Sequence, residues 1–164
     1  MSNIRYKDIK FFDDYVLLVI PKSKTDQFRN GNEVLLAKLD SISCPYETLS
    51  KYMQAAGLSV GSDQFLFRAI YKTKNGKSGL RKTNKKLSYT RCKELLVGRM
   101  REFVPEGLNI GLHSFRSGGA TAAASSGVSD RCWRRHGRWR SDVSYRYVKD
   151  SVQTRVQVSK NLGL

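Results

Sequence analysis

Two basic side chains three residues apart open the segment of the sequence best suited to chemistry. The segment reads Leu-His-Ser-Phe-Arg at 112–116 and begins a stretch rich in Gly, Ala and Ser. Residues three apart share one face of a helix, so His113 and Arg116 would point the same way. At a helix start, free backbone N–H groups add to such side chains and favour the binding of an anion. Taken alone, the pair is also typical of ordinary surface decoration.

Aromatic and basic side chains are interleaved in a second segment. Arg-His-Gly-Arg-Trp at 135–139 is followed closely by Tyr145 and Tyr147. A tryptophan among arginines is not the pattern of a hydrophobic core, although a core Trp with an aromatic helix stripe is the plain alternative. A third segment, Pro-Lys-Ser-Lys-Thr-Asp at 21–26, lies where the tip of a hairpin is expected. Its lysines alone would indicate only a solvated turn.

Together these segments resemble the catalytic domain of the tyrosine recombinases, the phage-integrase family. That family carries a hairpin-tip lysine, then His-x-x-Arg at the start of a buried helix, a second His or Trp, and a tyrosine. Here His113 and Arg116 match the His-x-x-Arg motif. Trp139 lies twenty-six residues after His113, and Tyr147 lies eight residues after Trp139. The sequence of residues 135–151 is most similar to the corresponding segment of eukaryotic mobile-element recombinases.

The resemblance implies DNA breaking and rejoining, as in site-specific recombination or integration, without metal or other cofactor. Tyr147 would attack the scissile phosphate and form a 3′-phosphotyrosyl bond, and the freed 5′-hydroxyl, or another, would later attack that bond. Arg116 would stabilise charge on the phosphate oxygens, and His113 would donate to the same phosphate or help the nucleophile lose its proton. Trp139 would donate through its indole N–H or pack the site. Lys24 would protonate the leaving oxygen.

Two of these assignments have competitors. Lys22 competes with Lys24, which the Ser-Lys-Thr context favours. The interval between Trp139 and Tyr147 is one residue shorter than the family's usual spacing. A one-residue deletion rotates a helix by ~100°, so Tyr145 is an alternative nucleophile. Tyr147 is favoured because the Val-Lys-Asp-Ser that follows it resembles the family's sequence after the tyrosine.

The chain departs from the family at its N-terminus. Family members carry another arginine on a helix before the first strand and a separate N-terminal core-binding domain. We therefore expect residues 1–164 to form a single, partial catalytic domain that lacks that helix and that domain. A catalytically inactive DNA-binding remnant is the alternative function, and a structural or interaction module that is basic by accident is a third.

The positive charge of the chain is concentrated in two clusters. Thirty Lys and Arg against fourteen Asp and Glu give a formal charge of +16, which points to a polyanionic partner, double-stranded DNA. Between 68 and 93 there are ten basic residues and no acid, and a second cluster spans 131–140. The candidate phosphate contacts are Lys82, Lys85, Lys86, Arg91, Arg134, Arg135 and Arg138. A solvated basic loop is the plain alternative for the first cluster.

Patterns of spacing and capping predict an α+β fold with a small N-terminal antiparallel sheet followed by a mainly helical bundle. The expected strands lie at 9–12, 15–20 and 32–39. The expected helices lie at 44–58, 88–103, 113–126, 129–139 and from 141 or 142 to 159, with a basic loop at 71–86. The small residues of 113–126 suggest that this helix is buried.

Several classes of protein are disfavoured by composition. The longest aliphatic run, 15–20, has six residues, whereas a membrane helix needs ~20. The three cysteines are scattered, which argues against a disulfide framework or a zinc site, and no carboxylate cluster suggests a two-metal nuclease. No apolar run follows Met1, so we expect an intracellular protein, nuclear if eukaryotic. The family resemblance implies a homotetramer on DNA, and we expect a monomer without DNA.

Overall fold

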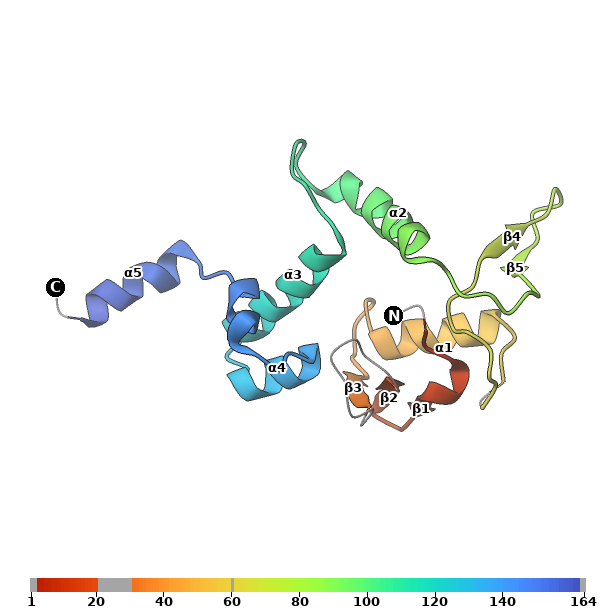
Figure 1. Cartoon of the computed structure of the whole chain (residues 1–164), viewed down its shortest axis with the longest axis horizontal. Helices are drawn as coiled ribbons and strands as arrows, with labels where there is room; N and C mark the ends of the chain where they lie inside the picture. The colour runs from red at the N-terminus through yellow and green to blue at the C-terminus, as the bar shows by residue number, and fades with distance from the viewer. Residues whose placement is uncertain (1–2, 21–30, 60, 163–164) are drawn as a thin grey trace. The chain divides into compact units, whose positions relative to one another are not determined.

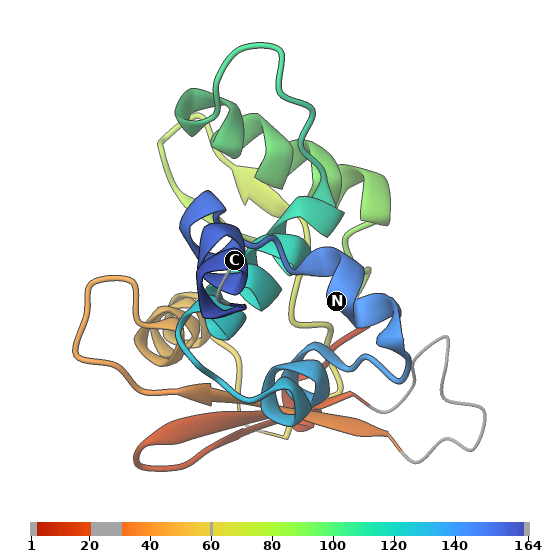
Figure 2. The same ribbon diagram turned by 90° about the vertical axis from the view of Figure 1, so that its left-hand side faces the viewer.

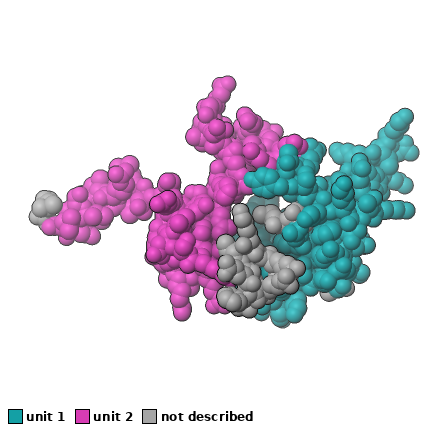
Figure 3. Space-filling model, in the orientation of Figure 1, with its two compact units in different colours: residues 1–92 teal, residues 93–164 magenta. Residues whose placement is uncertain are grey.

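The computed structural model describes residues 3–20, 31–59 and 61–162. The chain divides into two compact units, Met1–Cys92 and Lys93–Leu164 (Figure 3). The first unit holds a small antiparallel sheet, and helices occur in both units. The predicted α+β class is therefore confirmed.

The sheet of the first unit is the predicted meander. Its strands β1 (Ile9–Phe11), β2 (Tyr15–Ile20) and β3 (Asn32–Ala37) pair antiparallel in the order β1-β2-β3. Successive side chains of a strand point to opposite faces, and in β3 Val34 and Leu36 are half-buried whereas Leu35 is exposed. This alternation fixes the register, because a one-residue slip would expose the buried set.

The helix α1 (Pro45–Ala55) confirms the predicted helix at 44–58 and lies along one face of the sheet (Figures 1 and 2). Pro45 occupies the first helical turn, where its missing N–H costs nothing. The core between α1, the sheet and the neighbouring segments is formed by buried side chains of Ile4, Tyr6, Ile9, Val16, Met53 and Leu66.

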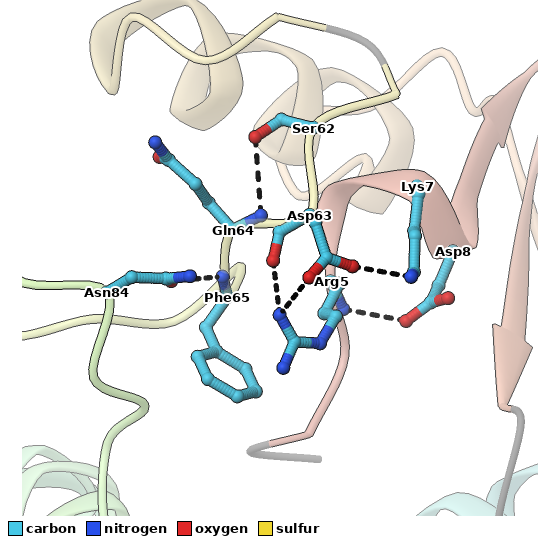
Figure 4. A network of polar contacts seen from close by, with 8 residues as sticks. All are labelled: Arg5, Lys7, Asp8, Ser62, Asp63, Gln64, Phe65 and Asn84. Carbon is cyan, nitrogen blue, oxygen red and sulfur yellow. Dashed lines mark hydrogen bonds and ion pairs between the residues drawn. The ribbon is translucent and has the colours of Figure 1, made fainter.

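A polar network fixes the segment before β1, which includes the 3₁₀ helix η1 (Tyr6–Asp8) (Figure 4). Arg5 and Lys7 both form ion pairs with Asp63, the Arg5 pair at 2.9 Å. The Arg5 guanidinium carbon lies 4.0 Å from the centroid of the Phe65 ring. The backbone N–H of Phe65 in turn donates to Asn84 at 2.8 Å. Three segments distant in sequence are thus joined.

The expected basic loop at 71–86 contains a hairpin that the sequence analysis did not predict. Strands β4 (Ile70–Lys72) and β5 (Ser78–Leu80) pair antiparallel around the turn at Asn75 and Gly76. Gly76 has φ +76°, a conformation that favours glycine. Each strand has three residues, and β5 reads Ser-Gly-Leu, so neither shows the alternating apolar pattern that predicts a strand.

The remaining helices largely follow the prediction. They are α2 (Tyr89–Met100) with the 3₁₀ turn η2 (Arg101–Phe103), then α3 (Leu112–Ser125), α4 (Asp130–Gly137) and α5 (Val152–Asn161). Within the second unit α3 is not buried as expected, since Ala120 is its one buried residue. Its described packing partners are α4 and the 3₁₀ helix η3 (Asp142–Tyr147), which cover one side. Within residues 3–20, 31–59 and 61–162, no helix has the length and apolar character needed to span a bilayer.

The predicted continuous helix from 141 or 142 to 159 is wrong. The chain forms η3, becomes extended at Val148 with φ −83° and ψ 133°, and begins α5 after Ser151. The carbonyl of Tyr147 and the N–H of Lys149 are both hydrogen-bonded to side chains of α3, so they are not available to a continuous helix. Ser151 then caps α5 by accepting from the N–H of Thr154 at 3.1 Å.

The end of α4 also differs from the prediction of a helix to Trp139. Arg138 adopts the left-handed conformation, with φ 57° and ψ 44°. The N–H of Trp139 then donates to the carbonyl of Arg134 at 2.9 Å, which closes the helix in the manner of a Schellman motif. This reversal turns the Trp139 side chain back over the helix end.

Candidate functional site

Tyr147 lies at the centre of an aromatic and basic cluster in the second unit. Its ring centroid is 6.5 Å from that of His113, with the rings 28° from parallel, and 5.5 Å from that of Trp139. The packing of η3 against α3 brings Tyr147 beside His113. His113 and Trp139, two residues predicted to act with Tyr147, are therefore brought to it from two other segments of the chain.

Arg116 belongs to the same cluster and is held from two sides. It is half-buried, its guanidinium carbon lies 4.2 Å from the centroid of the Trp139 ring, and its Nη2 donates to the carbonyl of Gly137. Burial lowers the pKa of Arg116, the positive charge of Arg138 lowers it further, and Tyr147 acts in the opposite direction. Arg116 remains a cation in spite of this, because the pKa of a guanidinium starts so high. Two like charges close together make this a favourable place for an anion.

Trp139 takes part through its ring. Besides Arg116 and Tyr147 it contacts the buried Trp133 edge-on, with centroids 5.6 Å apart. The ring covers Gly137 so closely that a Cβ added there would lie 1.7 Å from the Trp139 Cζ3 atom. Of the two roles predicted for Trp139, these contacts correspond to packing of the site.

Two hydroxyl groups that the sequence analysis did not single out hold the backbone of Tyr147. Ser117 donates to the Tyr147 carbonyl at 2.6 Å, and Thr121 donates to the same oxygen at 3.2 Å. Thr121 also accepts from the N–H of Lys149 at 3.1 Å. His113, Ser117 and Thr121 recur at intervals of four on α3, and this spacing was the available signal that they share a face.

Tyr145, the alternative nucleophile, is engaged elsewhere. Its hydroxyl donates to Asp130 at 2.8 Å, and its ring contacts Trp133 edge-on at 5.9 Å. The hydrogen bond to Asp130 is the main cause that raises the pKa of the Tyr145 hydroxyl. Asp130 also accepts from the indole N–H of Trp133 at 3.2 Å. Tyr145 therefore ties η3 to the start of α4.

The predicted phosphate-binding arginines of the second unit differ in their surroundings. Arg134 forms an ion pair with Asp142 at 2.9 Å and lies over the Tyr145 ring at 5.2 Å. Arg135 is exposed, and Arg138 is half-buried near Arg116. Arg135 is thus the least constrained of the three.

The predicted basic residues of the first unit are exposed. They are Lys82, Lys85, Lys86 and Arg91. Lys86 is tethered, because its ammonium group donates to the side chain of Asn3. The hairpin lysines, Lys24 and its competitor Lys22, lie outside the described residues.

The cluster around Tyr147 combines a phenol, an imidazole and a fixed guanidinium. The carboxylates of Asp130 and Asp142 are bound to Tyr145, Trp133 and Arg134, so they do not neutralise Arg116. A group of this kind can bind a phosphate through Arg116 and place a phenol next to it.

Comparison with known protein families finds no match. No curated protein matches the sequence either. The resemblance to the tyrosine recombinases accordingly depends on the residues themselves.

Proposed function

We propose that this chain binds double-stranded DNA and breaks and rejoins its strands through a 3′-phosphotyrosyl bond at Tyr147. The observation that carries the proposal is the cluster in which the Tyr147 ring lies 6.5 Å from that of His113 and 5.5 Å from that of Trp139, with Arg116 stacked against Trp139. The net charge of +16 supports DNA as the substrate.

In the proposed reaction the Tyr147 oxygen attacks the phosphorus atom and displaces the 5′-oxygen of the next nucleotide. Arg116 stabilises the charge that develops on the non-bridging oxygens. His113 accepts the phenolic proton or donates to the same phosphate, and Lys24 supplies the proton that the leaving 5′-oxygen needs. Rejoining is the reverse displacement by a 5′-hydroxyl, so no external energy source is required.

The test is covalent capture on a nicked duplex that cannot be rejoined. We expect a protein–DNA adduct that migrates slowly in a denaturing gel and disappears in Tyr147→Phe. Tyr145→Phe is the matched control, because it removes the same hydroxyl two residues away, and it should retain the adduct. An adduct that survives in Tyr147→Phe and disappears in Tyr145→Phe would overturn the assignment of the nucleophile.

A DNA-binding chain without cleavage activity is the second candidate. The observation in its favour is that the basic clusters at 68–93 and 131–140 include exposed residues, such as Lys82 and Arg135, that are not among the residues proposed for cleavage. In the same experiment this candidate predicts retarded migration under native conditions and no adduct. Absence of any binding at low salt would instead favour an interaction module that is basic for another reason.

A further inference from the structure

A pocket of about 370 Å³ lies in the first unit, beside the start of α2. Four cations line it, from the segment after β5 and from the first turn of α2. These cations are Arg81, Lys85, Lys86 and Arg91. Lys82, although in the middle of this segment, is not part of the lining. The basic cluster at 68–93 thus includes a pocket.

The interior of the pocket differs chemically from its rim. Ala69 and Leu87 line it and are half-buried, whereas the four cations are exposed. The aliphatic side chains therefore lie deeper than the charged groups. A phosphate alone would use the rim and leave this apolar interior empty.

The walls of the pocket are fixed by backbone hydrogen bonds to the core of the unit. The N–H of Leu87 donates to Phe67 at 3.0 Å, and the N–H of Arg81 donates to Ala69 at 2.8 Å. The buried Arg68 donates from Nη1 to the carbonyl of Arg81 at 3.2 Å. A wall held in this way loses little freedom when a ligand binds.

The combination of an apolar interior and a cationic rim favours one class of ligand. A nucleotide carries both a phosphate and a flat apolar base, and bases stack on guanidinium planes and apolar side chains. In a duplex the bases are stacked and paired, so only an unpaired or extruded base can enter a pocket. We propose that this pocket binds a single unpaired nucleotide, with its phosphate at the rim and its base against Ala69 and Leu87.

This proposal rests on the proposed function, since it takes DNA as the ligand. The experiment compares a labelled blunt duplex with the same duplex carrying a short single-stranded tail, by fluorescence anisotropy at fixed salt. We expect about tenfold tighter binding of the tailed duplex, because only the tail offers an unpaired base whose apolar surface can be buried in the pocket. Free deoxyadenosine monophosphate should abolish the preference at concentrations at which inorganic phosphate does not.

The variants separate the pocket from charge in general. Arg81→Gln with Lys85→Gln removes two charges from the rim and should abolish the preference for the tail. Lys74→Gln with Lys77→Gln removes the same charge from the turn between β4 and β5, which does not line the pocket. This control should weaken the binding of both duplexes equally and keep the preference. Circular dichroism of both variants checks that they are folded.

Several outcomes would overturn the pocket assignment. Equal affinity of the two duplexes would do so, as would disappearance of the preference in the Lys74 and Lys77 control. Equal competition by inorganic phosphate would show that the apolar interior contributes nothing. The proposed function is tested separately by the Tyr147 adduct, so a preference for tails without an adduct supports the pocket and refutes the cleavage. Formation of the adduct without a preference for tails does the reverse.

Discussion

Gly137 is the position at which the candidate site has no room for a side chain. A Cβ there would lie 1.7 Å from Cζ3 and 2.1 Å from Cε3 of Trp139. We expect Gly137→Ala to push Trp139 away and to remove the ring on which Arg116 is stacked. Overpacking of this kind costs about 1–3 kcal/mol of stability, and misplacement by about 1 Å can lower a rate about a hundredfold. Adduct yield and thermal unfolding measure the two effects.

Gly118 offers a matched control for this substitution. It lies inside α3, and nothing comes within 4 Å of a Cβ added there. Gly118→Ala should therefore stabilise the protein by about 0.5–1 kcal/mol, because alanine loses less backbone freedom than glycine in a helix. If both substitutions lowered the adduct yield equally, the close packing of Trp139 on Gly137 would not be the cause.

Tyr6 in the first unit carries a buried hydroxyl that has no hydrogen-bond partner among the described residues. We expect Tyr6→Phe to increase the free energy of unfolding by about 1 kcal/mol, since it removes an unsatisfied buried group. Tyr52→Phe should decrease it by a similar amount, because the Tyr52 hydroxyl donates to the carbonyl of Leu66 at 2.6 Å. Denaturation by urea measures both, and equal signs would contradict the difference between the two sites.

Tyr6 should also make the stability of the protein depend on alkaline pH. Burial raises the pKa of the Tyr6 hydroxyl above its ordinary value of 10.0, and the neighbouring Tyr52 raises it further. Above pH 10 the folded state therefore keeps a proton that the unfolded state releases. The free energy of unfolding is not affected by this difference below pH 10, and it declines as the pH rises further. Between neutral pH and pH 11, the stability of Tyr6→Phe should decline less than that of the wild type. Unfolding curves at several pH values check this.

At the scale of elements, α3 decides where η3 ends and how Tyr147 is presented. Ser117 and Thr121 bind the Tyr147 carbonyl, and Thr121 also binds the N–H of Lys149. In Ser117→Ala with Thr121→Val we expect the adduct at Tyr147 to fall by up to about a hundredfold, since three hydrogen bonds of about 1 kcal/mol each are lost and about 1.4 kcal/mol is a factor of ten. The freed backbone should also gain helix, which far-ultraviolet circular dichroism detects.

Ser125→Ala serves as the control for this pair, since Ser125 is exposed at the far end of α3. It should change neither the adduct nor the helix content. An unchanged adduct in the Ser117 and Thr121 double variant would mean that these hydroxyls do not position Tyr147.

The elements that were predicted correctly are those whose signals are local. Strand alternation in β3 and the serines before α2 and α4, Ser88 and Ser129, can be seen within a few residues. The apparently continuous helical pattern of 141–159, in contrast, did not indicate that α5 begins after Ser151. The break before it depends on hydroxyls of α3 twenty-six and thirty residues away, which no local pattern reveals.

The candidate site shows the same division. His113, Arg116, Trp139 and Tyr147 were found from their types and order. Spacing alone could not decide between Tyr145 and Tyr147. The structure adds that the Tyr145 hydroxyl donates to Asp130, fifteen residues earlier, which the sequence does not reveal. Gly137 was visible as a residue, but its close approach to Trp139 follows from the left-handed conformation of Arg138.

At the scale of the whole molecule, the excess positive charge is distributed over both units. The ten basic residues between 68 and 93 are separated by no acid, and all but the buried Arg68 are exposed. The arginines of α4 include one, Arg134, that already has Asp142 as its partner. Most protein–DNA hydrogen bonds go to phosphate and sugar, so we expect the affinity of the proposed DNA complex to depend more on salt than on sequence.

Reversal of the charges of Lys82, Lys85, Lys86 and Arg91 should then flatten the dependence of log K on log salt, by about 0.9 for each phosphate that is no longer neutralised.

Single substitutions in α4 refine this expectation. Arg135→Gln removes an exposed cation and should change the slope by the amount expected for about one phosphate. Arg134→Gln should change it less, because Asp142 competes with phosphate for this guanidinium. Titrations of one duplex at several salt concentrations measure all three. An unchanged slope in the fourfold variant would exclude the 68–93 cluster from the DNA interface, and a larger effect for Arg134 than for Arg135 would mean that DNA displaces Asp142 on binding.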